Sequence, residues 1–159
     1  MRASNGFTLI ELLITIVILA IIATVAVPGF GRLIEGNRLV SGTNLLISSA
    51  KFARSEAIKR GATITLSTTG LANGWCVHTG DASGSCADQI RSFESPDRLT
   101  FNPNGAIDIV FDRRGFLATG AGQIITVEPD NCESGEAGRL RTINISPVGR
   151  IEVISGDCP

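Results

Sequence analysis

The residue with the most demanding chemistry is Glu11, a carboxylate that lies inside an otherwise apolar stretch near the N-terminus. A carboxylate at membrane depth costs about 2.5 to 3.5 kcal/mol on insertion scales, and more where it has no partner. Cleavage between Gly6 and Phe7 would place a new α-amino group on Phe7, one helical turn from Glu11. The spacing therefore offers an ion pair, within one chain or between neighbouring chains. The alternative is a glutamate that snorkels at a membrane edge.

Residues that could support catalysis are sparse. His78 is the single histidine, and Asp81 and Ser83 lie near it in a turn-like segment. No G-x-S-x-G motif surrounds any serine, and no metal cluster or phosphate loop occurs at a useful spacing. An acidic loop of the kind that binds calcium is also lacking. We therefore expect a protein that is not an enzyme and that has no cofactor and no metal site.

Four cysteines lie in the polar C-terminal part: Cys76, Cys86, Cys132 and Cys158. A zinc site is disfavoured, because there is no C-x-x-C pair and only one histidine. Two disulfides are expected if this part lies outside a bacterial inner membrane, and buried or free thiols are the alternative in a reducing compartment. Three pairings are possible. Proximity favours Cys76 with Cys86, which leaves Cys132 with Cys158 to tie down the C-terminus.

The elements that position these groups begin with the apolar run. No charged residue occurs from Leu12 to Gly31, and Leu9 to Val27 consists almost wholly of Leu, Ile, Val, Ala and Thr. About 20 such residues suffice for a helix to cross the hydrocarbon layer, so we expect a transmembrane helix. The end of the run offers only a poor signal-peptidase site, which argues against an ordinary secretory signal. Pro28 lacks an N–H group and is expected to bend or locally open the helix.

An amphipathic segment continues the helix. From Leu33 to Arg60, apolar residues recur at spacings of three, four and seven, and Gly61 is a suitable stop. The segment from Ala62 to Ser67 then alternates with period two, as expected of a half-buried strand. The fold class is therefore α+β, with a long N-terminal helix packed on a C-terminal antiparallel β head. Further strands are predicted at Trp75 to His78, Ile90 to Phe93, Ile107 to Phe111, Gln123 to Val127, Leu140 to Ile145 and Arg150 to Ile154.

Composition allows about one domain with a modest core, since 43% of the residues are hydrophobic and 18% are charged. Trp75, a large aromatic residue beside a cysteine, is predicted to lie in that core. Arg54 and Glu56 are predicted to face solvent or an interface with another subunit.

The run Gly6-Phe7-Thr8-Leu9-Ile10-Glu11-Leu12-Leu13 resembles, residue for residue, the prepilin motif of type IV pilins and type II secretion pseudopilins. The resemblance implies cleavage after Gly6 and N-methylation of Phe7 by a prepilin peptidase. It also implies that Glu11 aids recruitment into a filament by neutralising the N-terminal amine of a neighbouring subunit. Two later stretches, Ala53 to Gly61 and Asn73-Gly74-Trp75, resemble the H-type pseudopilins (GspH) and the related FimT/FimU minor pilins.

This resemblance implies an organisation and a function. Residues 1–6 would be the leader, 7–31 the transmembrane half of a stem helix, 32–60 its amphipathic half, and 61–159 a periplasmic β-sheet head. The expected protein is a single-pass inner-membrane subunit that assembles at or near the tip of a type IV pilus or type II secretion pseudopilus and supports filament initiation. Its expected partners are other pilins or pseudopilins through the stem helix, the prepilin peptidase, the inner-membrane assembly platform and membrane lipid.

The resemblance also carries an alternative, a DNA-binding minor pilin for uptake in natural transformation. Some FimT-type proteins use a Gly-Arg-x-Arg motif, which this chain shows at 138–141, whereas the later position reads Gly149-Arg150-Ile151-Glu152. Glu152 would repel phosphate, and the formal net charge of −1 gives no global basic footprint. Solvated strand-edge arginines are therefore favoured over DNA contacts. The candidate DNA-binding residues are Arg139, Arg141 and Arg150.

Overall fold

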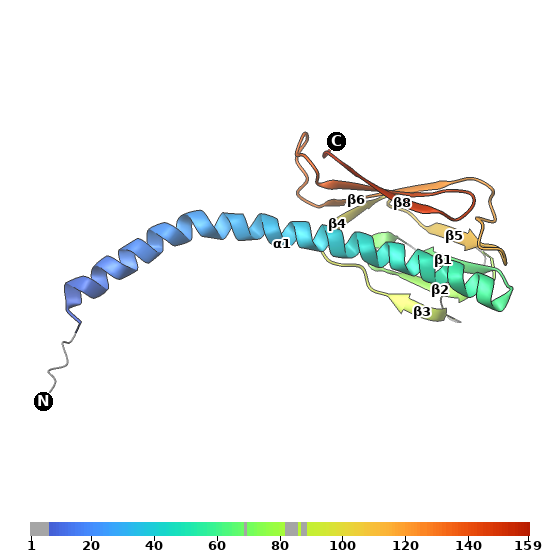
Figure 1. Cartoon of the computed structure of the whole chain (residues 1–159), viewed down its shortest axis with the longest axis horizontal. Helices are drawn as coiled ribbons and strands as arrows, with labels where there is room; N and C mark the ends of the chain where they lie inside the picture. The colour runs from blue at the N-terminus through green and yellow to red at the C-terminus, as the bar shows by residue number, and fades with distance from the viewer. Residues whose placement is uncertain (1–6, 69, 82–85, 87–88) are drawn as a thin grey trace, which may run out of the picture. The chain divides into compact units, whose positions relative to one another are not determined.

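The computed structural model describes residues 7–68, 70–81, 86 and 89–159, without the side chains at 25 and 27–29 (Figure 1). The predicted leader with its cleavage residue Gly6 lies outside these residues, as does Ser83. The chain forms two compact units, Met1–Gly36 and Asn37–Pro159. The second unit, called the head unit below, holds the end of the helix and all the strands that the structure describes.

Helix α1 spans Leu9–Arg60. It ends in a Schellman motif, in which Gly61 has a φ of +62° and the Ala62 N–H donates to the Ala57 carbonyl at 3.3 Å. Glycine suits this position because it has no Cβ to clash in the left-handed conformation. The predicted helix end at Gly61 is therefore confirmed.

The strands form two antiparallel sheets of four strands each, both of which pack on the part of α1 within the head unit (Figure 1). The first sheet has the order β3-β2-β1-β5, and the second has the order β4-β6-β7-β8. A short 3₁₀ helix, η1 (Leu71–Asn73), joins β1 to β2. The strands are β1 (Ile64–Thr68), β2 (Trp75–Thr79), β3 (Gln89–Phe93), β4 (Leu99–Asn102), β5 (Ile107–Phe111), β6 (Gln123–Pro129), β7 (Leu140–Ile145) and β8 (Ile151–Gly156).

Each strand predicted from the sequence overlaps an observed strand, and the α+β class with a helix packed on an antiparallel head is confirmed. Two features were not predicted, namely strand β4 and the division of the strands into two sheets. Strand β4 is only four residues long, and its pairing partner β6 lies more than 20 residues further along the chain. The division into two sheets follows from such distant pairings, which periodicity within one strand does not encode.

One core joins the helix to both sheets. Small residues of α1, Ala50, Ala53 and Ala57, are almost completely buried, so the strands can approach the helix closely. Larger side chains from the inner faces of the sheets fill the space between, and they include Leu66, Val77, Ile109, Phe111, Phe101, Ile125 and Ile143.

Strand β1 is buried on both faces, which corrects the prediction of a half-buried strand. It lies between β2 and β5, and its polar side chains find partners rather than solvent. The Thr65 hydroxyl donates to the Gly80 carbonyl at 2.6 Å, and the Ser67 hydroxyl donates to Asp108 Oδ1 at 2.6 Å. These bonds satisfy polar groups that would otherwise be costly to bury.

Trp75 is 3% exposed, as predicted for a core residue. Its ring stacks on Phe93, with centroids 6.3 Å apart, and meets the edge of Phe101. The indole N–H donates to Ser49 Oγ of α1 at 2.7 Å. The side chain therefore links the helix to both sheets, and its one polar group is satisfied.

Two disulfides are present, Cys76–Cys86 and Cys132–Cys158, which are the pairs that sequence proximity favours. The second pair holds the C-terminus to the loop between β6 and β7. The Cys158 N–H donates to the Glu136 carbonyl at 3.0 Å, and the Cys158 carbonyl accepts from Gly135 at 3.0 Å.

Candidate functional site

The start of α1 is a capping box built by Thr8 and Glu11. The Glu11 N–H donates to Thr8 Oγ1 at 3.3 Å, and the Thr8 N–H donates to Glu11 Oε2 at 3.5 Å. Glu11 thus has a partner within its own chain, at the helix end that favours negative charge. Sequence reasoning missed the role of Thr8, although the T-x-x-E spacing is a recognised signal.

Both bonds of the capping box are long, and Glu11 remains exposed. Phe7, the residue that would carry the new α-amino group, precedes the box and is 78% exposed. The carboxylate and the position of the predicted amine are therefore both accessible to a neighbouring molecule. Gly6, the other residue predicted for processing, is outside the described part of the chain.

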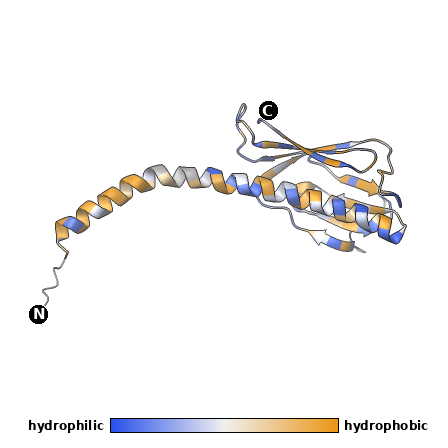
Figure 2. Cartoon of the chain, viewed as in Figure 1, coloured by the Kyte–Doolittle hydropathy of each residue, from blue (hydrophilic) through white to orange (hydrophobic). Residues whose placement is uncertain are grey.

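The first turns of α1 carry apolar side chains around the whole helix. From Leu9 to Ile22, every large apolar side chain is about half exposed or more, with exposed fractions from 49% at Leu13 to 78% at Leu9. In Figure 2 the ribbon of these first turns is coloured mostly as hydrophobic, and the colouring becomes mixed further along the helix. Contiguous apolar surface of this extent is typical of membrane or protein contacts.

Among the residues that the structure describes, no helix combines the length and the apolar character needed to cross a membrane.

Pro28 was predicted to act in assembly by bending or locally opening the helix. Helix α1 extends on both sides of Pro28, and the role of this residue in assembly stays a prediction.

Arg54 is half-buried and fastens α1 to two turns of the head unit, contacts that the prediction of a residue facing solvent or another subunit did not include. Its Nε donates to the Gly115 carbonyl at 2.9 Å, and its Nη2 donates to the Val148 carbonyl at 3.1 Å. The turns approach each other so closely that a Cβ on Gly149 would overlap the Gly115 carbonyl oxygen. Both glycines have positive φ, +79° and +74°, so glycine is needed for conformation as well as for space.

Glu56 is also buried rather than solvent-facing, with 8% of the residue exposed. Arg60 Nε donates to Glu56 Oε2 at 2.6 Å, and Lys59 Nζ lies 3.6 Å from Oε1. The hydrogen bond from Arg60 is the main cause that lowers the pKa of Glu56 from its ordinary value of 4.5. The stretch from Ala53 to Gly61 therefore has a structural role within the head unit.

Asp112 holds the turn that presents Gly115 to Arg54. Its Oδ1 accepts from the Phe116 N–H at 2.9 Å and from the Arg114 N–H at 2.8 Å. These bonds, that from Phe116 first, lower the pKa of Asp112 below its usual range. Arg114 also pairs with the carboxylate at 3.0 Å.

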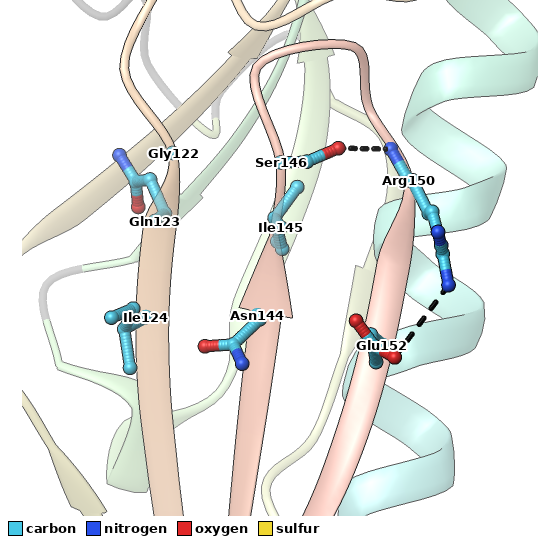
Figure 3. Close-up of a pocket in the computed structure, with 8 residues that line it drawn as sticks. All are labelled: Gly122, Gln123, Ile124, Asn144, Ile145, Ser146, Arg150 and Glu152. Carbon is cyan, nitrogen blue, oxygen red and sulfur yellow. Dashed lines mark hydrogen bonds and ion pairs between the residues drawn. The ribbon is translucent and has the colours of Figure 1, made fainter.

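The three arginines predicted as possible DNA ligands each have partners in the head unit. Arg139 pairs with Glu136 at 2.6 Å, and Arg141 donates to the Gly138 carbonyl at 2.7 Å. Arg150 lies 3.5 Å from Glu152, and Figure 3 shows both at the edge of a pocket on the second sheet. A phosphate that approached Arg150 would therefore meet a carboxylate.

The arginines also lie at different ends of the hairpin formed by β7 and β8. Leu140 pairs with Gly156 at one end, and Ile145 pairs with Ile151 at the other. Five residues of strand, at about 3.4 Å each, separate these ends by roughly 17 Å. The structure thus brings Arg139 and Arg141 together but leaves Arg150 apart from them.

His78 is 1% exposed, and its Nε2 lies 2.8 Å from Ser67 Oγ. Because the Ser67 hydroxyl donates to Asp108, this serine is engaged with a carboxylate and is not presented to solvent. Among the residues that the structure describes, no three His, Cys, Asp or Glu side chains are grouped as metal ligands.

Comparisons with known proteins agree with this geometry. Residues 42–149 match the family model of the type II transport protein GspH, and residues 1–27 match the prokaryotic N-terminal methylation motif. A crystal structure of the type IV minor pilin FimU of Pseudomonas aeruginosa is similar with a TM-score of 0.63 and 23% identity, over 76% of this chain and 90% of that chain. A second crystal form of FimU gives a TM-score of 0.59 and 23% identity, over 73% and 92%.

Proposed function

Because the chain belongs to the GspH family of type II transport proteins, and is a minor pilin or pseudopilin of the GspH/FimT/FimU kind, we propose that it assembles at or near a filament tip. The filament is a type IV pilus or a type II secretion pseudopilus. In this role the subunit supports filament initiation and has no catalytic task.

The observation that carries the proposal is the exposed Glu11 at the start of an exposed apolar helix. A prepilin peptidase cleaves after Gly6 and methylates Phe7. The resulting ammonium group of one subunit is then neutralised by Glu11 of a neighbour. This pairing offsets the roughly 2.5 to 3.5 kcal/mol that an unpartnered carboxylate costs at membrane depth.

The capping box prepares Glu11 for this exchange. In the isolated chain the carboxylate accepts one long bond, 3.5 Å, from the Thr8 N–H. A charged ammonium group forms a stronger hydrogen bond than a neutral amide, so the neighbouring N-terminus competes well for the same oxygen. Thr8 Oγ1 continues to cap the helix through its bond from Glu11 N–H.

We place the mature subunit in the bacterial inner membrane, with a single span and a periplasmic head. The exposed apolar side chains of the first turns support contact with lipid or with other stem helices. The two disulfides fit an oxidising compartment, and Arg2 of the leader fits a cytoplasmic N-terminus of the chain before processing. The partners are other pilins or pseudopilins, the peptidase and the assembly platform.

Variants of Gly6 and Glu11 test the proposal in the native host. Gly6→Ala is expected to leave the chain unprocessed, as judged by its mass. Glu11→Gln is expected to be processed but lost from filaments sheared from the cells. Glu133→Gln, an exposed glutamate of the head, is the matched control and should be incorporated normally. Normal incorporation of both Gly6→Ala and Glu11→Gln would refute the proposal.

A deletion strain distinguishes the machines that the subunit could serve. Loss of twitching indicates a type IV pilus, and loss of secretion indicates a pseudopilus. Loss of transformation alone, with both other activities intact, would instead favour the DNA-uptake alternative.

A further inference from the structure

Three exposed apolar side chains gather at the end of the head unit where α1 stops. They are Ile58 of the helix, Phe116 of the loop after β5, and Val148 of the turn between β7 and β8, and they are 52%, 39% and 53% exposed. We call these three residues the Phe116 patch. They come from segments far apart in the sequence, so the fold assembles the patch.

The contacts of Arg54 and the two glycines bring the patch together. The position of a Cβ on Gly115 would be 2.7 Å from Ile58 Cδ1, which places the turn before Phe116 against the helix. Leu117 N–H donates to the Pro147 carbonyl at 2.9 Å, which joins the loop of Phe116 to the turn of Val148. The patch therefore has a fixed scaffold beneath it.

Cationic side chains surround the Phe116 patch. Arg113 is exposed and has no ion-pair partner among the residues that the structure describes, and the Arg54 guanidinium is bonded to carbonyls rather than to a carboxylate. The surrounding charges give this end a net charge of about +2, whereas the whole chain has a formal net charge of −1. The cations are Arg54, Lys59, Arg60, Arg113, Arg114 and Arg150, and the carboxylates are Glu56, Asp81, Asp112 and Glu152.

A pocket lies at the same end of the head unit, where α1 stops, and is suited to an acidic side chain. It is lined by the helix stop, Gly61 to Thr63, and by Asp112, Arg113 and Arg114. The Asp112 carboxylate is already occupied by Arg114 and by backbone N–H groups. Arg113 is therefore the cation available to a carboxylate that enters the pocket.

We propose that the Phe116 patch and its cationic rim dock the head of a neighbouring pilin-class subunit whose contact face has an apolar centre and carboxylates at its rim. This inference rests on the proposed function, because it requires a filament neighbour. Apolar side chains at the centre with charges around them are typical of a protein interface. A nucleic acid fits less well, because its binding is dominated by phosphate contacts, which the apolar centre of the patch cannot make.

Site-specific photocross-linking of the full chain in its native host tests the inference. Phe116→p-benzoylphenylalanine is introduced, the cells are irradiated, and adducts are identified by mass spectrometry of sheared filaments. The expected adduct joins position 116 to an Asp- or Glu-rich peptide of another subunit that carries the prepilin motif. The matched control is Ile124→p-benzoylphenylalanine, which should not give this adduct. Ile124 lies on the second sheet and is 64% exposed.

Charge reversal at the rim then tests the chemistry. Arg113→Glu, combined with the probe at position 116, should lower the yield of the adduct at least about tenfold. The reason is that a carboxylate at this position would repel the carboxylates of the partner and weaken binding. Arg141→Glu, at a different part of the head unit, should leave the adduct unchanged. Arg113 is exposed, so folding is expected to be retained and is checked by the fluorescence of Trp75.

The other outcomes separate the two proposals. An adduct with nucleic acid or lipid, an adduct that does not depend on Arg113, or no adduct while the chain is present in filaments would overturn the inference and leave the proposed function standing. Absence of the wild-type chain from filaments would refute the proposed function, and the docking inference with it.

Discussion

Arg54 is the side chain whose removal should most clearly reveal how the helix is held to the head. Arg54→Met keeps the length and packing of the aliphatic stem but removes both hydrogen bonds to the turns at Gly115 and Val148. The two carbonyls then lose their charged donor. The close contact between the turns depends on that donor, because the Gly115 oxygen lies beside Arg54 and Gly149.

The expected loss follows from the two bonds. A hydrogen bond to a charged group contributes about 1.5 to 3 kcal/mol. The Nε bond to Gly115 is partly buried and 2.9 Å long, whereas the Nη2 bond to Val148 is exposed and 3.1 Å long. The second bond is weakened by solvent, so we expect the free energy of unfolding to fall by roughly 2 to 4 kcal/mol in total.

Urea unfolding of the full processed chain in a nonionic detergent measures this loss. Trp75 is the single tryptophan and is buried beside α1, so its fluorescence reports the head unit alone. Lys51→Met, an exposed cation one turn earlier on the same helix, is the matched control and should change stability by less than about 0.5 kcal/mol. Equal stability of Arg54→Met and Lys51→Met would refute this reasoning.

Three further predictions concern the head unit, each measured by the same unfolding assay. Gly149→Ala should destabilise by more than about 3 kcal/mol because of strain and overlap with backbone, whereas Gly61→Ala, which has a positive φ but open space, should cost only about 1 to 2 kcal/mol. The pKa of Glu56 is lowered on folding, so the carboxylate stabilises the folded state above its unfolded pKa, and this contribution is lost as the pH falls through the folded pKa. The free energy of unfolding of Glu56→Gln should therefore approach that of the wild type as the pH falls below about 4.5. Replacing Cys132 and Cys158 by serine should cost about 3 to 4 kcal/mol from loop closure.

Each of these predictions has a contradicting result. Equal losses for Gly149→Ala and Gly61→Ala would show that the two turns do not approach as described. A stability difference between wild type and Glu56→Gln that is independent of pH would show that the carboxylate does not titrate differently on folding. Unchanged unfolding of the serine double variant would show that the C-terminal bridge does not constrain the chain.

The helix and most strands were predictable because their signals are local. Apolar spacing with a glycine stop specified α1, and period-two alternation specified the strand Ile64–Thr68. The extent of burial was not predictable in the same way. Thr65 and Ser67 read as solvent-facing residues, yet β1 lies inside its sheet and both hydroxyls bind within the protein. Strand neighbours decide this, and they are distant in sequence.

The processing motif was recognisable from consecutive residues, but the contacts of the head were not. Arg54 binds Gly115 and Val148, which lie 61 and 94 residues further along the chain. A charged residue on a helix usually faces solvent, so its type alone did not predict these contacts within the head unit. Thr8 is a different case, because the T-x-x-E spacing that precedes the apolar run was readable.

The most direct test of the central claim is the intact mass of the wild-type chain recovered from sheared filaments. We predict a mass that corresponds to a chain that begins at Phe7, with one methyl group on the Phe7 nitrogen and two disulfides. The full-length chain, or a chain cut after the apolar run near Ala26, would contradict the assignment of Gly6 and Phe7 as the processing site. Absence of the chain from filaments would contradict its role as a filament subunit.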